Sequence, residues 1–242
     1  MYAAVGDSMT SMYGRKFKRA PEGSYAVDAS GKLTDVSGRL ILNEQGFPVV
    51  DTDIEYIGET MPDWKGGFGT SFTWKGLKCS ISFDGQHGGH VWSMTNWVLN
   101  SRGKGLATLE GREGGFVPDG VVALSDGNYR VYTDAIPKES MPAYYETLYD
   151  RNCTESNFVS TQYLRLREAR LEYSLPKKLL TRTRFINSLS VAVFGNNLYT
   201  WSSFPGFDPT AVAMRGHALS PGFDFLQMPG TAQYGFSIKL VY

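Results

Sequence analysis

The chain has 242 residues, and its 24 basic and 24 acidic residues balance to a formal net charge of zero. This balance offers no basic face for nucleic acid and no acidic tail typical of disorder, so no nucleic-acid partner is expected. Aromatic residues make up 14% of the chain and there are 27 glycines, which favours strands and turns over helices.

The first predicted element is Asp7 to Lys18, interpreted as the tail of a strand, and residues 23–57 follow as a long connection. No signal peptide is evident, because Met1 to Thr10 lacks a basic stretch followed by an apolar run. No window of about 18 apolar residues predicts a membrane helix. Taken alone, these absences fit a soluble cytoplasmic protein, and they fit equally a fragment of a transmembrane barrel whose strands alternate.

Two alternating segments on either side of Lys75-Gly76 predict a tight β-hairpin. The first strand has its larger side chains on one face, at Phe68, Thr70, Phe72 and Trp74. The second strand does the same with Leu77, Cys79, Ile81 and Phe83. The intervening residues are small or polar, so each strand has one apolar face and one polar face.

Residues 88–158 form a second long connection, rich in Gly, Pro, Asp and aromatic residues. Aromatic rings beside polar groups suit stacking on a sugar or packing on a partner. The candidate ligand or partner contacts in this connection are Trp92, Trp97, Tyr129, Tyr132, Tyr144 and Tyr145. The alternative interpretation is that these rings pack the connection upon itself.

Catalytic, metal and cofactor motifs are weak throughout. His87 and His90 lack a third ligand nearby in the sequence, so a turn at a strand end is favoured over a metal site. Residues 111–115 are Gly-rich but lack the Lys-Ser/Thr of a phosphate loop, and we interpret them as a flexible loop. The acidic residues of the same connection are too dispersed to favour a glycosidase pair: Asp119, Asp126, Asp134 and Glu139.

The two cysteines, Cys79 and Cys153, lack metal-ligand spacing, and we interpret each as a small buried or lipid-facing residue. No arrangement of Ser, Cys and His typical of nucleophilic catalysis is present. The sequence therefore predicts no enzyme, no cofactor and no metal site.

The next predicted strand is 163–175, where the parity of the apolar residues shifts once and indicates a β-bulge near Arg167-Glu168. Pro176 ends this strand. Another strand begins at Leu189 and ends near Asn196-Asn197.

The last strand follows a long connection, 202–232, and alternates most clearly. Its large residues share one face: Tyr234, Phe236, Ile238, Leu240 and Tyr242. We predict that this C-terminal strand acts in barrel assembly.

The connections alternate in length. Lys75-Gly76 and 176–187 are short, whereas 23–57, 88–158 and 202–232 are long. If successive strands run up and down, every long connection falls at one end, as in outer-membrane barrels with short periplasmic turns and long extracellular loops. The predicted fold class is all-β: a partial, antiparallel up-and-down transmembrane β-barrel of roughly five to seven strands.

Several different short motifs follow one another in a characteristic order along nearly the whole chain. They are Tyr56–Gly58, Met61–Phe68, Phe83–Gly89, Tyr163–Ala169, Tyr173–Lys178, Phe194–Trp201, Gly206–Pro209, Pro229–Thr231 and Tyr234–Tyr242. In this order and spacing the chain resembles the C-terminal barrel portion of SusC/RagA-type TonB-linked outer-membrane proteins. It departs from the common pattern at 28–53, which argues against a calcium-type loop, and at Thr210, where an acidic residue is usual.

The resemblance implies import of large nutrients, glycans or oligopeptides, across the outer membrane. It also implies a SusD-like lipoprotein as a lid, and TonB, contacted through a missing N-terminal part, as the energy source. Residues 1–242 would be the C-terminal part of the barrel, with the plug and N-terminal domains absent. Plugged transporters have about 22 strands, so these residues alone could not close a barrel.

Aromatic residues at the predicted strand ends fit the girdles that mark a bilayer boundary: Trp64, Trp74, Tyr173, Tyr199, Trp201 and Tyr242. Two alternative classes remain open. A secreted soluble β-sandwich that binds carbohydrate would cover its apolar strand faces with a second sheet. An adhesin-type surface protein would share the location of an importer but not the order of its motifs.

Overall fold

The computed structural model describes residues 6–27, 31–180, 185–206, 208–210 and 222–242. The chain divides into two compact units, each built from three separate stretches. Unit 1 comprises Met1–Thr60, His90–Val159 and Val212–Gln227, and unit 2 comprises Met61–Gly89, Ser160–Ala211 and Met228–Tyr242. None of the helices in the described residues has the length and apolar character that a membrane crossing requires.

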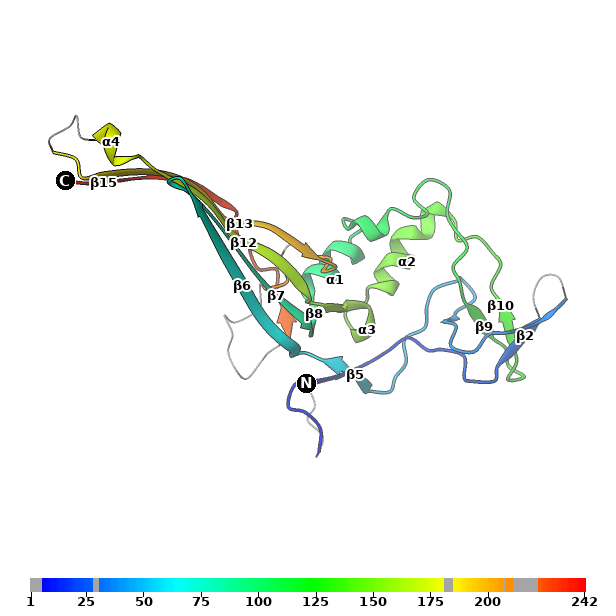
Figure 1. Ribbon diagram of the computed structural model, residues 1–242. Coiled ribbons are helices and arrows are strands. Elements are labelled where there is room, and N and C mark those ends of the chain that lie inside the picture. The colour runs from blue at the N-terminus through cyan, green and yellow to red at the C-terminus, as the bar shows by residue number, and fades with distance from the viewer. Residues whose placement is uncertain (1–5, 28–30, 181–184, 207, 211–221) are drawn as a thin grey trace. The chain divides into compact units, whose positions relative to one another are not determined.

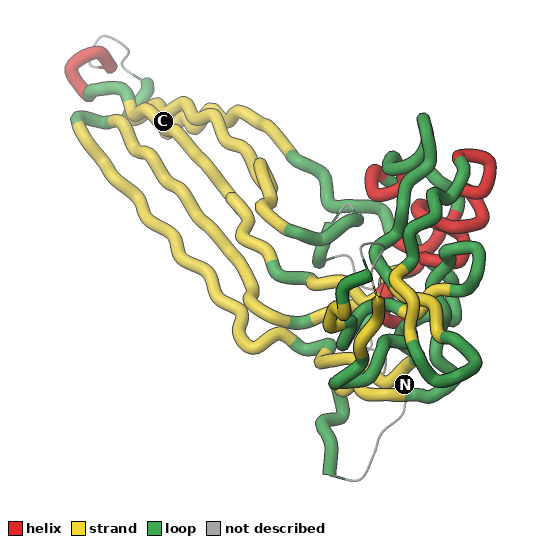
Figure 2. Tube along the Cα trace, turned by 90° about the vertical axis from the view of Figure 1, so that its right-hand side faces the viewer, coloured by secondary structure: helices red, strands yellow, loops and turns green. Residues whose placement is uncertain are grey.

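Unit 2 is built on a five-stranded sheet in the order β15-β13-β12-β7-β6. Its strands are β6 (Pro62–Trp74), β7 (Leu77–Gly88), β12 (Tyr163–Ser174), β13 (Ser188–Ser202) and β15 (Gln233–Val241). All four pairings are antiparallel, and each strand lies beside the next one along the chain (Figures 1 and 2). The strands predicted from Phe68 onward and their up-and-down order are confirmed. The strand tail predicted at Asp7 to Lys18 is β1 (Ser11–Gly14), which pairs with β5 (Glu55–Glu59) outside this sheet. A short helix, α4 (Lys177–Leu180), lies in the connection between β12 and β13.

The hairpin between β6 and β7 turns at the two predicted residues. Trp74 pairs with Leu77, and Lys75 and Gly76 both have positive φ, 47° and 88°. Positive φ at both central residues matches the twist of the flanking strands. A Cβ at position 76 would lie 2.7 Å from the carbonyl oxygen of Ser174, so glycine is required there on two counts.

The register of β12 shifts between Leu166 and Glu168 against both neighbours, which confirms the predicted bulge. The prediction that β13 ends near Asn196-Asn197 is wrong, because the strand continues to Ser202. Asn197 has a φ of 52° and lies opposite the bulge. Asparagine tolerates this left-handed conformation, so the residue that resembled a turn is an irregularity inside a continuous strand.

Unit 1 consists of short elements. Its strands are β1 (Ser11–Gly14), β2 (Tyr25–Val27), β3 (Leu33–Asp35), β4 (Ile41–Leu42), β5 (Glu55–Glu59), β8 (His90–Ser93), β9 (Val121–Ala123), β10 (Tyr129–Val131), β11 (Phe158–Ser160) and β14 (Phe223–Asp224). They form a pair β1-β5, a sheet in the order β3-β2-β10-β9-β4, and a sheet in the order β11-β8-β14. The helices are α1 (Met94–Ser101), α2 (Met141–Leu148) and α3 (Thr154–Asn157), with 3-10 turns η1 (Leu106–Thr108) and η2 (Lys138–Ser140).

The two segments predicted as long connections, 23–57 and 88–158, therefore hold ordered structure of their own. Small apolar clusters stabilise it, one around Val36 and Val121, one around Ile136 and Met141, and one around Leu42 and Tyr132. Each cluster joins residues far apart in the sequence. In neither segment do the apolar residues repeat every two or 3.6 positions over a sustained stretch. The sequence pattern therefore does not predict these short strands and helices.

Candidate functional site

One face of the unit 2 sheet is apolar across all five strands. Residues that pair across antiparallel strands share a face, so the register assembles rows of side chains. One row consists of Phe72, Cys79, Leu171, Val193 and Phe236. The next row consists of Trp74, Leu77, Tyr173, Val191 and Ile238. The bulge at Arg167 keeps Leu166 and Ala169 on this same face despite their odd spacing.

The apolar face is exposed. Phe72 is 69% and Phe236 is 76% accessible, and Ile238, Val193 and Leu171 are exposed as well. A soluble β-sandwich would cover such a face with a second sheet, and that expectation is not met here. Water-soluble monomers seldom leave a contiguous apolar surface of this extent uncovered.

The opposite face of the sheet carries small and charged residues. Arg170 lies 3.0 Å from Glu172, and Arg167 lies 3.1 Å from Asp84. The pairing of charges leaves a surface suited to contact with water. The sheet thus separates an apolar surface from a polar one within a single layer.

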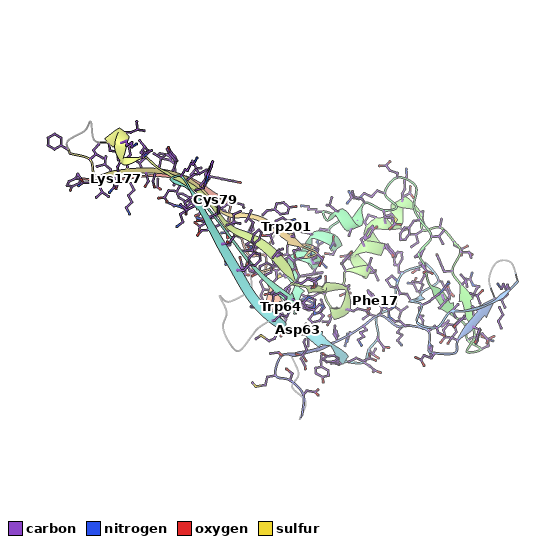
Figure 3. The ribbon with its side chains drawn as sticks, in the orientation of Figure 1. Phe17, Asp63, Trp64, Cys79, Lys177 and Trp201 are labelled. Atoms are coloured by element: carbon purple, nitrogen blue, oxygen red, sulfur yellow. The ribbon has the colours of Figure 1, made fainter. Side chains whose placement is uncertain are left out.

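Aromatic residues mark both ends of the apolar face. Trp64, Tyr199 and Trp201 lie toward one end of the strands, and Trp74, Tyr173 and Tyr242 lie toward the other, near the turns. Figure 3 shows Trp64 and Trp201 near the same end and Lys177 of α4 at the opposite end. The rings of Tyr199 and Trp201 contact each other edge to face, with centroids 4.8 Å apart.

Unit 1 contains an aromatic pocket of about 270 Å³. Its lining includes Met12 and Tyr13 of β1, Trp92 of β8, and Phe223 with Phe225 from the β14 segment. Trp92 packs between these elements, with centroids 6.2 Å from Phe223 and 6.4 Å from Phe225.

Local hydrogen bonds explain why the pocket forms. β14 runs parallel to β8, and the hydroxyl of Ser93 donates to Asp224 Oδ2 at 2.6 Å. The same hydroxyl accepts the N–H of Asn96 at 3.0 Å and so caps α1. Arg151, which lines the pocket, lies over the ring of Trp97, 5.6 Å from its centroid. The result is an aromatic recess with one cation at its edge, a combination suited to stacking and hydrogen bonding.

The six aromatic residues proposed as contacts do not converge on one surface. Trp92 lines the aromatic pocket, and Trp97 packs against Trp92 with its ring centroid 6.5 Å away. Tyr144 and Tyr145 are buried with Phe116, and burial raises the pKa of Tyr144 to about 12. The remaining two, Tyr132 and Tyr129, belong to two other apolar clusters. This placement favours the interpretation that most of these rings pack the segment upon itself, and ligand contact by Trp92 and Trp97 stays a prediction.

Sequence reasoning missed most of the aromatic pocket. Phe223, Phe225 and Arg151 come from stretches that carry no motif, and only the parallel pairing of β14 with β8 brings the two rings to Trp92. No group of three or more His, Cys, Asp or Glu residues in the described residues could hold a metal ion. His87 stacks on Trp64 and His90 on Phe158. Both cysteines are free: Cys79 lies in the apolar face and Cys153 is buried.

Comparison with known proteins identifies relatives over most of the chain. No family model matches. The chain is 28% identical over 210 residues to the TonB-dependent receptor P3 of Formosa agariphila, and 26% identical over 191 residues to the TonB-dependent receptor P39 of the same organism. These matches cover 85% and 78% of the chain but only 19% and 17% of the relatives. The chain therefore spans about a fifth of their length.

The fold is similar to that of part of the RagAB peptide importer. In the 'closed-closed' state the TM-score is 0.58 at 18% identity, covering 99% of this chain and 24% of that one. In the 'open-open' state the TM-score is 0.56 at 17% identity, covering 96% and 22%. The chain is thus similar in sequence to a segment of TonB-dependent receptors and similar in fold to a segment of the RagAB importer.

The Asp208-Pro209 motif is tied to the polar face of the sheet. Arg165 Nη2 lies 2.7 Å from Asp208 Oδ1, and the two side chains are only 7% and 10% exposed. Burial raises the pKa of the Asp208 carboxyl, but hydrogen bonds from Thr210 and Gly230 and the charge of Arg165 outweigh it, so the pKa lies below its ordinary value. The pair fixes the connection after β13 to β12, which gives this motif a structural role.

Proposed function

We propose that this chain supplies C-terminal strands to the β-barrel of a TonB-dependent outer-membrane importer. The observation that carries the proposal is the exposed apolar face of the five-stranded sheet. Hydrocarbon would bury this face, while the polar face would line an aqueous interior. In lipid every backbone group needs a partner, so the edge strands β6 and β15 would pair with strands from the rest of the receptor.

The dimensions of the sheet support this proposal. The strand from Trp64 to Trp74 rises about 33 Å at ~3.3 Å per residue. With strands tilted by about 40°, that length spans ~25 Å, the height of the apolar band in outer-membrane barrels. The aromatic residues at both ends of the face would then lie at the two membrane interfaces.

We further propose an orientation and partners. The turn at Lys75-Gly76 and the α4 connection would face the periplasm, and unit 1 would face the outside, where a SusD-like lipoprotein would act as a lid. TonB would act through parts of the receptor outside residues 1–242, which also hold the plug. The nutrient would be an oligopeptide or a glycan, and the RagAB likeness supports the peptide. The role is transport without catalytic chemistry.

The topology is tested with single cysteines in the full-length receptor in intact cells. Ser125→Cys places a thiol on an exposed turn of unit 1, and Lys177→Cys places one on α4. A membrane-impermeant maleimide should label position 125 in intact cells and position 177 only after the outer membrane is permeabilised. The unsubstituted receptor measures background labelling of Cys79 and Cys153. Labelling of both new thiols in intact cells would contradict the orientation.

Transport is tested separately by uptake. A strain that lacks the receptor gene should lose uptake of either labelled oligopeptides or labelled oligosaccharides, and the intact gene should restore it. Deletion of the tonB gene should have the same effect. Unchanged uptake of both nutrient classes in the receptor deletion strain would contradict the import role.

A further inference from the structure

Unit 1 contains a second cavity, of about 570 Å³, which shares no lining residue with the aromatic pocket. It lies between the C-terminal end of α1 and the N-terminal end of α2, and Met141 and Tyr145 of α2 form buried parts of its wall. Its charged lining residues are Arg102, Arg112, Lys138 and Glu146. A volume of this size is typical of pockets that hold small ligands, roughly 300–1,000 Å³.

The charges of this cationic cavity are unbalanced. Three basic side chains face a single acidic one, although the chain as a whole is neutral. Arg102 and Lys138 are exposed, and within the described part of the chain neither forms an ion pair. Two cations at one cavity therefore have no anionic partner from the described residues.

The third cation, Arg112, is held in place by its own loop. Its Nε donates to the carbonyl oxygen of Thr108 at 2.7 Å, and its Nη2 donates to Thr108 Oγ1 at 2.7 Å and to the carbonyl oxygen of Gly103. Thr108 is fully buried, so two of these three acceptors are fixed. A guanidinium that is already ordered loses less freedom when it binds an anion.

Glycine at position 111 permits this arrangement. Gly111 has a φ of 76°, and a Cβ there would lie 2.5 Å from Met141 Sδ. Only glycine lets the 111–115 segment approach the cavity wall while Arg112 stays at the rim. The Gly-rich segment interpreted from sequence as a flexible loop thus positions a cation.

We propose that this cavity binds a carboxylate of an acidic oligopeptide. Arginine and lysine side chains bind carboxylates through charge-assisted hydrogen bonds. A peptide is favoured over an acidic glycan for two reasons. Glu146 would repel a polyanion but suits a chain of mixed charge, and Met141 with Pro142 offers apolar wall rather than a stacking platform. Among the described lining residues the single aromatic ring is that of Tyr145, which is buried with its hydroxyl donated to the carbonyl oxygen of Glu110.

This inference deepens the proposed import function and rests on it, because the peptide would be the nutrient. It is tested by fluorescence polarisation with the full-length receptor in detergent. The probe is a labelled, C-terminally amidated hexapeptide of mixed charge, Ala-Asp-Ala-Lys-Ala-Ala, and the reference replaces its Asp by Asn. The Asp peptide should bind about tenfold more tightly, the difference expected of one charge-assisted contact. The double variant Arg102→Ala/Lys138→Ala should abolish that difference.

The matched control is Arg15→Ala/Arg130→Ala, which removes the same charge from exposed positions of unit 1 outside the cavity and should preserve the difference. Equal binding of the two peptides by the unsubstituted receptor would overturn the proposal. Loss of the affinity difference in the control variant, to the same extent as in the cavity variant, would overturn it too. Tighter binding of an oligogalacturonate than of the Asp peptide would overturn the peptide assignment. Receptor-dependent uptake of a neutral nutrient tests the import role without the cationic cavity. If that uptake persists while the two peptides bind equally, the cavity proposal fails and the import function does not.

Discussion

The two units of this chain place similar apolar residues in opposite environments. In unit 1, Val36, Val121 and Ile136 are almost fully buried in small clusters that exclude water. In unit 2, Phe72 and Phe236 project from the sheet with most of their surface uncovered. Unit 1 contains its own core, whereas unit 2 has an apolar sheet face that is left exposed. Apolar content alone therefore does not identify an interior; the arrangement of the side chains does.

The largest expected effect concerns the well-buried ion pair between Arg165 and Asp208 in unit 2. Arg165→Ala would leave Asp208 buried without its partner, which costs about 3–5 kcal/mol. The control Arg167→Ala removes a half-exposed partner of Asp84 and should cost about 0–1 kcal/mol. The measurement is the temperature at which the full-length receptor loses its folded band on a gel. Equal shifts for the two variants would contradict the assigned burial.

The next test concerns the core of unit 1. Ile136→Ala removes a side chain that is 1% exposed and should destabilise unit 1 by about 2–5 kcal/mol, because it leaves a cavity. Leu106→Ala, at a position 86% exposed, should change little. Limited proteolysis of the receptor, with cleavage mapped to unit 1, measures the effect. Protection of the Ile136 variant to the level of the Leu106 variant would show that this cluster does not stabilise unit 1.

A charge on the apolar face tests the other side of the comparison. If the apolar face meets lipid as proposed, Ile238→Arg or Phe236→Arg should impair barrel assembly, since arginine on a lipid face costs about 2–4 kcal/mol at mid-bilayer. Ser237 lies on the polar face beside Arg170 and Ala192, so Ser237→Arg should impair assembly less. Folded receptor in outer-membrane fractions is the measurement. Equal yields of all three variants would refute the assignment of the two faces.

The smallest effect expected is a pH dependence from Asp208. Its folded pKa is lowered below the unfolded value of about 3.9, so its ionised form adds stability above that pH. This contribution should decline as pH falls from about 4 through the folded pKa. Asp208→Asn should remove that part of the acid sensitivity when unfolding of the receptor is followed between pH 6 and about 3. Parallel pH profiles for the two proteins would contradict it.

Much of unit 2 was predictable because its information is local. Alternation over a few residues defines each strand, Lys75-Gly76 defines the turn, and one change of parity locates the bulge at Arg167. The extension of β13 past Asn197 was not predictable, since asparagine fits both a turn and a strand irregularity. Of the candidate contacts, Trp92 lines the aromatic pocket and Trp97 packs against Trp92. Tyr132, Tyr144 and Tyr145 are buried in cores, and ligand contact by the two tryptophans stays a prediction.

The sequence by itself determined which side chains share a face of each long strand, and hence that the sheet separates an apolar surface from a polar one. A period of two needs no distant partner to be recognised, and one buried or lipid-facing surface allows only one register. The tertiary structure alone decided that β14 joins β8, that Arg165 reaches Asp208, and that Arg102, Arg112 and Lys138 meet at one cavity. These contacts join residues remote in sequence, and they depend on how short elements pack together rather than on any repeat within them.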